Sequence, residues 1–335
     1  MEKTNYGRAI RDGFAYLLKN YDEVFTIGQG LWSPWYVGNS MTDLDKEFGK
    51  ERVIDTPVSE AACTGAAIGA SLCGKRPIVI HPRVDFMILA TDPIVNQAAK
   101  WSHMLGGQAH PAVTVRGIVN RGGQQGAQHS QALHSWFAHI PGLRVVMPAT
   151  VRDARDLLVA SVLCDDPVLY IDDRWLYEQE DDIGKPVELK LEQIEPQVLH
   201  EGSDISLVTC SFSTLQALQA AAELKKQGVS AEVVDLRMLN PIKWQKVVNS
   251  VTKTGRLLAV DGGWTNCGMA GEIMAAMCER VAWNKWKTPP ARITLTNSPA
   301  PTSGPLETAY YTKVSDVVEK SLHMVKNGVG LGAKH

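Results

Sequence analysis

One glutamate stands out because of the residues around it. Glu60 follows a short apolar run that ends at Pro57, and it opens a stretch with little side-chain bulk: Ala61, Ala62, Gly65, Ala66, Gly69 and Ala70. Proline disfavours helix in the residue before it and Ser59 can cap a first turn, so we expect a helix to begin near Glu60. A helix so poor in bulk usually lets another backbone or a flat ligand come close. Its first carboxyl group can then serve chemistry in an apolar pocket, although a glutamate there often only complements the helix dipole.

A histidine and an arginine are the other chemical candidates. His129 lies just after the glycine-rich segment 122–126. An imidazole can donate a hydrogen bond or move a proton near neutral pH, whereas most histidines in polar loops are idle. Arg83 could bind an anionic substrate or form a surface ion pair, and the sequence leaves these two alternatives open. We assign His134 and His139 to structure.

The segments that must position these residues alternate between strand and helix. Apolar runs predict strands at 24–27, 52–54, 76–81, 112–119, 143–147 and 167–171, and helical patterns include 6–20, 85–105 and 151–164. This alternation indicates a parallel sheet covered on both faces. After an acidic, proline-containing stretch the pattern restarts, so we predict an α/β protein of two doubly wound units. The expected parts are a first domain at 1–185, a linker at 186–203, a second domain at 204–326 and a loose tail at 327–335.

Composition narrows the class of protein. The net charge is −2, with 44% apolar and 21% charged residues, so nothing favours nucleic acid or an anionic membrane as partner. No apolar run reaches transmembrane length, and residues 1–19 carry charges throughout, unlike a secretory signal. The 6 cysteines form no CxxC pair and are expected to be reduced, mostly buried thiols of a cytoplasmic protein. The 9 tryptophans favour an oligomer.

Common catalytic motifs are missing from the chain. No GxGxxG follows the first strand, and there is no P-loop GxxxxGK[ST], no HExxH and no GxSxG. The glycines at 328, 330 and 332 are not a phosphate loop, because no strand precedes them and no helix follows. A dinucleotide, nucleoside triphosphate, zinc-protease or serine-hydrolase site is therefore not indicated.

Three stretches together resemble a known family. They are IDTPVSEAA at 54–62, IVNQAAK at 94–100, and QHSQ at 128–131 with WFAHIPGL at 136–143. In this order they resemble the beta subunit of 2-oxo acid dehydrogenase E1 components, which are transketolase-like thiamine diphosphate enzymes. The second half is similar too, through 231–237 and 253–257. The resemblance implies a transketolase-like pyrimidine-binding domain followed by a transketolase C-terminal domain.

The resemblance also implies roles for single residues. In that family, thiamine diphosphate loses a proton from its thiazolium C2, and its own aminopyrimidine is the base. Glu60 matches the carboxyl group that bonds ring nitrogen N1′ and favours the imino tautomer for this step. Phe86 matches an aromatic side chain that packs on the pyrimidine, and Val58 matches the pocket wall and its backbone contacts. His129 matches an active-site histidine that donates to the substrate and assists acyl transfer.

A motif that the chain lacks indicates a partner subunit. The family holds the diphosphate end through Mg²⁺ on a GDG…N segment, which is absent here and is implied on a separate alpha subunit. We therefore expect an α2β2 assembly, no turnover by this chain alone, and a lipoyl acyltransferase as a further candidate partner.

Departures from the family pattern leave the substrate open. Gln29, Pro82 and Gln124 stand where other residues are usual, and DGGW at 261–264 replaces a frequent His-Glu pair. The first hypothesis is decarboxylation of a 2-oxo acid with transfer of the acyl or aldehyde unit. The alternatives are half of a split transketolase that moves ketol units, with only Arg83 and His129 as anchors, and a non-catalytic assembly subunit.

Overall fold

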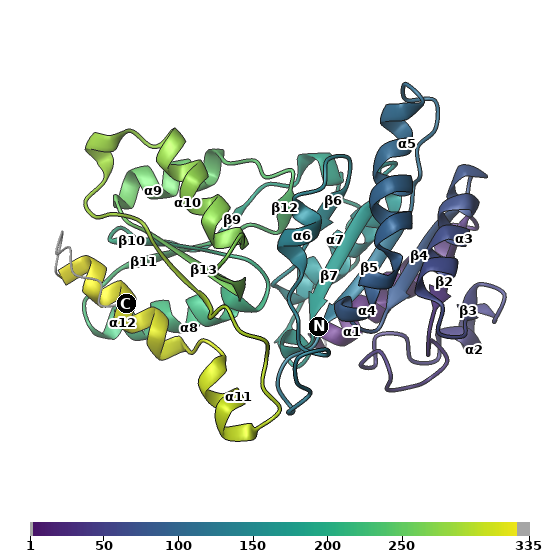
Figure 1. Ribbon diagram of the computed structural model, residues 1–335, viewed down its shortest axis with the longest axis horizontal. Coiled ribbons are helices and arrows are strands. Elements are labelled where there is room, and N and C mark those ends of the chain that lie inside the picture. Colours follow the sequence, from purple (N-terminus) through teal and green to yellow (C-terminus); the bar gives the residue numbers. More distant parts are fainter. Residues whose placement is uncertain (1–2, 327–335) are drawn as a thin grey trace. The chain divides into compact units, whose positions relative to one another are not determined.

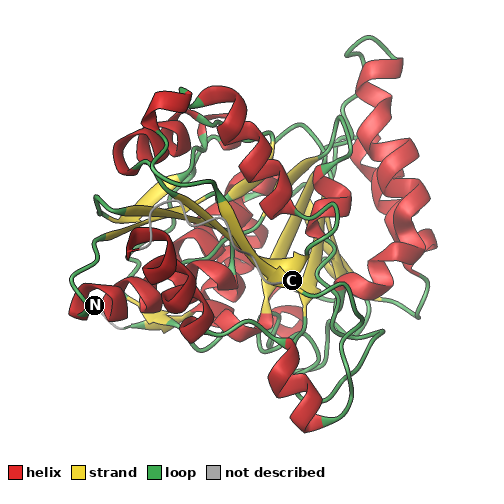
Figure 2. Cartoon of the chain, turned by 60° about the vertical axis from the view of Figure 1, so that its left-hand side comes forward, coloured by secondary structure: helices red, strands yellow, loops and turns green. Residues whose placement is uncertain are grey.

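The computed structural model describes residues 3–326, and it forms two units (Figure 1). The first runs to Ile194 and also includes Met238–Pro241; the second comprises Glu195–Arg237 and the described chain from Ile242 onward. Each unit contains a mostly parallel sheet with helices packed against it, so the α/β prediction is confirmed. Figure 2 shows these strands lying between helices. The predicted tail, 327–335, lies outside the described residues, and the predicted extents of the domains stay a prediction.

The first unit is built on a seven-stranded sheet of order β12-β6-β7-β5-β4-β2-β3. Its larger strands are β2 (Val24–Gly28), β3 (Val53–Asp55), β4 (Arg76–His81), β5 (Thr114–Val119), β6 (Arg144–Val146), β7 (Val168–Asp173) and β12 (Met238–Asn240). All pairs are parallel except β12 with β6. A separate antiparallel pair joins β1 (Thr4–Asn5) to β8 (Glu180–Asp181). The carboxyl ends of β2, β3 and β4 therefore meet at one edge of the sheet.

Helices cover both faces of this sheet. They are α1 (Tyr6–Asn20), α2 (Leu44–Phe48), α3 (Glu60–Leu72), α4 (Val84–Met87), α5 (Ala99–Met104), α6 (His134–Ala138) and α7 (Val151–Leu163). Right-handed crossovers put α3 and α5 on one face and α7 on the other, because the chain moves along the sheet in opposite directions before and after β6. Helix α1 packs along α7. The face that carries α3 is thus the one that presents Glu60.

The helix expected at 85–105 is interrupted. After α4 the chain forms a 3-10 turn at Ile88–Ala90 and a π-helical segment at Pro93–Ala98 before α5 begins. The cause is Pro93, which has no N–H to donate and whose ring crowds the preceding turn. The prediction of one long helix was wrong in this respect, and the interruption leaves α4 as a short separate element.

Two further expectations need correction. Ser59 occupies the N-cap position of α3, but its side chain makes no capping hydrogen bond. Its φ of −160° and ψ of 66° are not the usual extended cap geometry, which explains the missing bond. Among the cysteines, Cys164 and Cys210 are buried, whereas Cys73 and Cys267 are exposed because they lie at a helix end and in a turn.

A buried ion pair joins the middle strands of the first unit. Arg116 on β5 donates from Nε to Asp172 Oδ1 (2.8 Å) and from Nη2 to Oδ2 (3.0 Å), and both side chains are fully buried. Arg116 also donates to Ser40 Oγ (2.9 Å) and to Tyr177 Oη (2.8 Å). Burial alone would lower the pKa of Arg116, but the carboxylate of Asp172 holds it above its ordinary value. β5 leads directly into the His129 loop, so this pair anchors the strand from which the loop departs.

The second unit has a five-stranded sheet of order β14-β13-β10-β11-β9. Its strands are β9 (Gln197–His200), β10 (Ile205–Thr209), β11 (Ala231–Asp235), β13 (Leu257–Trp264) and β14 (Ala291–Leu295). Its helices are α8 (Phe212–Lys226), α9 (Gln245–Thr254), α10 (Met269–Arg280), α11 (Gly304–Tyr310) and α12 (Val314–Lys326). Only β9 runs antiparallel to its neighbour. The DGGW stretch at 261–264 is therefore the end of a strand.

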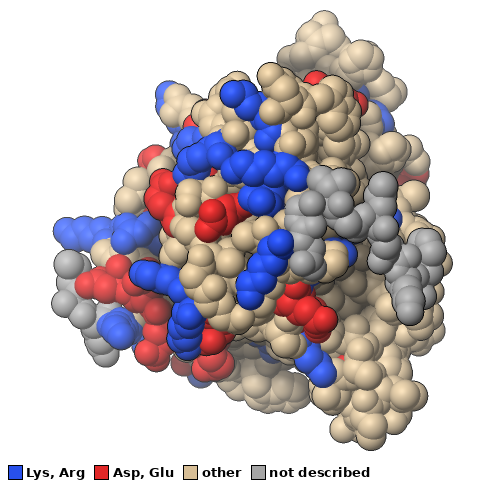
Figure 3. Space-filling view, turned by 90° about the vertical axis from the view of Figure 1, so that its left-hand side faces the viewer, with Lys and Arg blue, Asp and Glu red and all other residues tan. Residues whose placement is uncertain are grey.

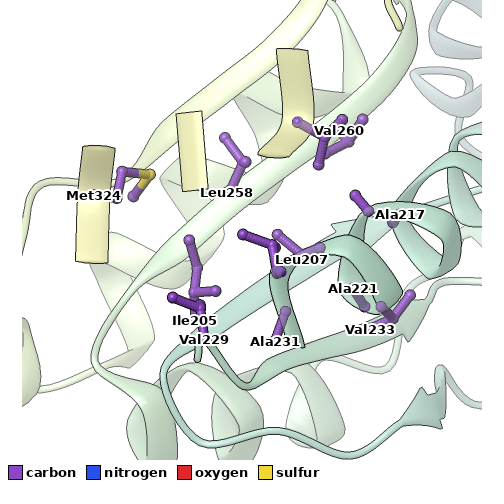
Figure 4. Packing of buried hydrophobic residues seen from close by; sticks show 13 residues of the cluster. Ile205, Leu207, Ala217, Ala221, Val229, Ala231, Val233, Leu258, Val260 and Met324 are labelled. Carbon is purple, nitrogen blue, oxygen red and sulfur yellow. The ribbon is translucent and has the colours of Figure 1, made fainter. Parts of the chain in front are cut away.

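Small side chains let α8 lie close on the second sheet. Ala217 and Ala221 face strand residues such as Leu207 and Val233, and all four are fully buried (Figure 4). Met324 of α12 closes the same cluster. Removing this apolar surface from water stabilises the unit by about 25 cal/mol per Å².

The surface shown in Figure 3 carries Lys and Arg side chains among Asp and Glu side chains. That face thus bears charges of both signs, in line with the net charge of −2 for the whole sequence. Within residues 3–326, no helix combines the length and the apolar character that crossing a bilayer demands.

Candidate active site

A small, partly open hollow lies where β2, β3 and β4 end in the first unit. Open α/β sheets commonly bind ligands outside the carboxyl ends of their parallel strands. The hollow is lined by Gly28, Gln29, Thr56, Pro57, Ser59, Glu60, Cys63, Val79, Ile80, His81 and Pro82. Among these described residues Glu60 is the only acidic one, so a single carboxylate faces a largely apolar wall.

The strand ends are tied together by backbone contacts. A Cβ on Gly28 would lie 2.4 Å from the carbonyl oxygen of Ile80, so only glycine allows β2 and β4 to approach this closely. The carbonyl of Gly28 accepts from Thr56 N (2.9 Å). Asp55 Oδ1 accepts from Gly30 N (2.6 Å) and Leu31 N (3.3 Å). These bonds fix the loop after β2 against the end of β3.

Glu60 is the first residue of α3, as its sequence context predicts. It is half-buried, and its carboxylate makes no hydrogen bond or ion pair with any residue in the described part of the chain. The partial positive charge of the helix N-terminus favours an anion here. Val58, two residues earlier, is 64% exposed. The carboxylate is therefore held at the hollow without a partner of its own, and it is free to bond a ligand.

His81 is a site residue that the sequence did not suggest. It ends β4, lines the hollow and is buried, with Nε2 lying 3.3 Å from Thr64 Oγ1. Burial lowers the pKa of His81 to about 4, so the ring is neutral at pH 7. Its position as the last residue of an apolar strand run was the one available signal.

A second group of residues gathers on α4 and the loop between β5 and α6. The rings of Phe86 and His129 meet edge to face, with centroids 5.2 Å apart and planes at 82°. Arg83 Nη1 donates to the side-chain oxygen of Gln125 and to the backbone oxygen of His129 (3.3 Å). The structure thus brings together three residues singled out in the sequence. Pro82 links this group to the hollow through the chain.

Arg83 hydrogen-bonds to residues of its own chain, which bears on whether it binds an anionic substrate or forms a surface ion pair. Partial burial lowers the pKa of Arg83, although a guanidinium stays charged at neutral pH. Only Nη1 is bonded; Nε and Nη2 have no partner among the described residues. Of the departures from the family pattern, Gln29 lines the hollow and donates to Tyr36 Oη (2.9 Å), while Gln124 adopts a positive φ of 58° in the loop.

The small-residue face of α3 is uncovered. Ala61, Ala62 and Ala66 are exposed, and a Cβ added to Gly65 or Gly69 would meet nothing within 4 Å. The close approach that this composition predicts is therefore not made by any of residues 3–326.

Comparison with known proteins decides the family. The model of the transketolase pyrimidine-binding domain matches residues 2–179, and that of the transketolase C-terminal domain matches residues 195–317. The chain belongs to this transketolase-like family. Within it, the beta subunit of acetoin:2,6-dichlorophenolindophenol oxidoreductase from Cupriavidus necator is 38% identical over 83% of this chain and 82% of that protein. The family resemblance found in the sequence is thus confirmed.

Other members of the family give the same result. The corresponding acetoin oxidoreductase subunit of Bacillus subtilis is 35% identical over 95% of this chain and 96% of that protein. The pyruvate dehydrogenase E1 beta subunit of Rhizobium meliloti is 34% identical over 93% of this chain and 67% of that protein. A solved structure titled "Split gene transketolase, inactive beta4 tetramer" has a TM-score of 0.77 at 19% identity, covering 97% of this chain and 99% of that one. At that identity the likeness shows the fold.

Proposed function

We propose that this chain is the beta subunit of a thiamine diphosphate-dependent enzyme that decarboxylates a 2-oxo acid and transfers the resulting acyl or aldehyde unit. The observation that supports this most directly is the unpartnered Glu60 carboxylate at the N-terminus of α3, beside a hollow with a largely apolar lining. It lies in the segment that matches a pyrimidine-binding domain. An aminopyrimidine needs a flat apolar slot with one carboxylate, and the lining residues fit that need.

In this proposal Glu60 binds the pyrimidine ring of the cofactor. It does not transfer a proton to the substrate. When bound, thiamine diphosphate supplies the carbon nucleophile and the electron sink for decarboxylation. The carboxyl group of Glu60 would bond ring nitrogen N1′, and the apolar wall would strengthen that bond by excluding water. Val58 is exposed and does not itself line the hollow, so it would contribute wall and backbone contacts only to a bound ligand, and Phe86 would offer its ring, 37% exposed, for packing.

His129 and Arg83 would serve the substrate. The imidazole of His129 packs against Phe86 through ring contact, and its nitrogens are left for a hydrogen bond to substrate oxygen and for assisting acyl transfer. The unbonded Nε and Nη2 of Arg83 can donate hydrogen bonds to a substrate carboxylate. Arg83 directly follows Pro82, which lines the hollow, and it donates to the backbone oxygen of His129 (3.3 Å).

A partner chain completes the site in this proposal. An alpha subunit carries the Mg²⁺ that holds the diphosphate, and two copies of each chain form an α2β2 assembly in the cytoplasm. The uncovered face of α3 supports the need for a covering chain. A lipoyl acyltransferase is the acceptor that we propose for the acyl unit.

The two alternatives have less support. Relatives that are more than 30% identical carry names of acetoin and pyruvate oxidoreductase beta subunits, whereas the split transketolase likeness rests on 19% identity. A purely structural subunit would have no need for an unpartnered carboxylate beside a hollow, because such a group is costly to shield from water.

The test compares the chain alone with the chain co-expressed with its alpha partner. The complex should bind thiamine diphosphate and turn over a 2-oxo acid, and the isolated chain should not. In the complex, Glu60→Gln should lower turnover at least about 100-fold, on the scale of losing one preorganised catalytic hydrogen bond. Turnover that survives Glu60→Gln, or robust activity of the chain by itself, contradicts the proposal.

A further inference from the structure

One short element contacts the His129 loop on both sides of the histidine. Arg83 precedes α4 and donates to the backbone oxygen of His129 (3.3 Å), while Phe86 of α4 meets its ring. Asp85, between them, accepts from the backbone N–H of Gln131 through Oδ1 (3.0 Å). These contacts around His129 therefore come from α4 and the residue just before it.

The loop is anchored at its start by Asn120, which donates to the carbonyl oxygen of Pro82 (3.2 Å), and by the ion pair of Arg121 with Asp173 (2.9 Å), but it has few other contacts around His129. It runs from the end of β5 at Val119 to the start of α6 at His134 and contains no strand or helix. Gly122, Gly123 and Gly126 adopt positive φ values, so this backbone lacks the pairing of regular structure. Loops of this kind owe their position to a small number of bonds.

The imidazole of His129 depends on these bonds for its direction. Its ring makes no hydrogen bond with any residue the structure describes, and its contact is the edge-to-face meeting with Phe86. A ring contact of this type tolerates sliding more readily than a hydrogen bond does. The backbone on either side of residue 129 must therefore be fixed if the ring is to face one way.

Burying the carboxyl group of Asp85 at this position costs free energy. It is only 5% exposed, and burial raises the pKa of its carboxyl group, partly offset by the hydrogen bond from the Gln131 backbone. An apolar side chain would fill a buried position on α4 at lower cost. The hydrogen bond to Gln131 accounts for an oxygen acceptor at this position, because the backbone N–H of Gln131 would otherwise lose its partner.

We propose that Asp85 is a positioning residue: by holding the backbone of Gln131, it sets the direction in which His129 presents its imidazole to the substrate. The inference rests on the proposed function, in which His129 serves acyl transfer. Asp85 touches neither substrate nor cofactor in this scheme. It acts only through the loop.

The test uses the complex of this chain with its alpha partner and three variants. Asp85→Ala removes the acceptor, and Asp85→Asn keeps an oxygen that can accept from Gln131. Asp92→Ala is the matched control, since exposed Asp92 accepts from Asn96 (2.7 Å) in the same helical region. Asp85→Ala should lower kcat for acyl transfer at least about tenfold, the range of one positioning contact. Thiamine diphosphate affinity should stay within about twofold, and Asp85→Asn and Asp92→Ala should stay near the parent.

Two readouts separate positioning from a general effect on folding. Hydrogen exchange should rise at least about tenfold in peptides covering 126–131 of Asp85→Ala, with β2 and β4 unchanged. The double variant Asp85→Ala/His129→Ala should be no slower than His129→Ala, because a residue that acts through His129 has nothing left to position. Unchanged loop exchange, additive losses in the double variant, or an Asp85→Asn variant as slow as Asp85→Ala overturns the proposal.

Failure of the proposed function gives a different pattern. If His129→Ala and Glu60→Gln leave turnover intact, the proposed function is wrong, and the exchange of the loop in Asp85→Ala still reports on the Asp85 contact. If His129→Ala slows acyl transfer and Asp85→Ala does not, only the role of Asp85 is wrong.

Discussion

Replacing Arg116 with methionine should destabilise the first unit by about 3–5 kcal/mol. The change leaves Asp172 fully buried without its cation, which is the situation in which breaking a buried ion pair costs most. Tyr177 continues to donate to Asp172 Oδ2 (2.5 Å), so the carboxylate keeps one hydrogen bond of the three it accepts from these two residues. The 3–5 kcal/mol reflect the loss of the guanidinium charge beside Asp172, which the one remaining hydrogen bond does not replace.

Hydrogen exchange of the β5 amides is the suitable assay. The chain has two units, so a single unfolding transition of the whole protein would not isolate the first one. A loss of 3 kcal/mol corresponds to exchange at least about 100-fold faster in peptides covering 114–119. The control is Arg144→Met, which breaks the partly exposed pair with Asp166 (2.8 Å) and should cost less than about 1 kcal/mol.

The double variant Arg116→Met/Asp172→Asn tests the stated cause. An asparagine side chain is neutral and can still accept from Tyr177, so most of the lost stability should return. The explanation is wrong if hydrogen exchange of β5 is unchanged in Arg116→Met, or if the double variant is as unstable as the single one. Either result would show that Arg116 does not stabilise the unit by neutralising the buried charge of Asp172.

Three more outcomes are expected. Because burial lowers the pKa of His81 to about 4, the unfolded chain binds a proton below about pH 6.5 that the folded chain does not bind. The free energy of unfolding should therefore fall by up to about 3 kcal/mol as pH decreases from about 6.5 to about 4. In His81→Phe, the melting temperature should depend less on pH over that range. Gly28→Ala should destabilise by about 1–3 kcal/mol in melts, since its Cβ would meet the oxygen of Ile80, and an unchanged melt would refute the close approach. Alkylation followed by mass spectrometry should label exposed Cys73 quickly and leave Cys164 unlabelled, because burial raises the pKa of Cys164 to about 11; equal rates would contradict the packing.

Much of the first unit could be predicted from local pattern. The helix at Tyr6–Asn20 follows from apolar periodicity, and the start of α3 at Glu60 follows from Pro57 before it. These signals lie within a few residues of the elements they specify. The interruption at Pro93 shows the limit, since a proline was visible but its consequence depends on how the helix packs.

The candidate site was only partly within reach of the sequence. Glu60 and His129 were singled out by their sequence context and Phe86 through family resemblance, and the roles that the resemblance implies for them stay a prediction. Asp85 was missed because its partner, Gln131, is 46 residues away and is bonded through its backbone, which leaves no trace in residue type. His81 was missed because burial, and not its identity, makes it neutral.

The strand β12 has a consequence for any attempt to separate the two units. Met238–Asn240 belongs to the sheet of the first unit, where the Asn240 side chain donates to the carbonyls of Ile140 (3.1 Å) and Leu143 (2.8 Å). The polypeptide consequently crosses between the units three times. After a single protease cut near Ile194, β12 would still hold the C-terminal fragment to the sheet of the first unit. A chain truncated at that point would lack β12, and the edge of β6 would be exposed for pairing with other chains.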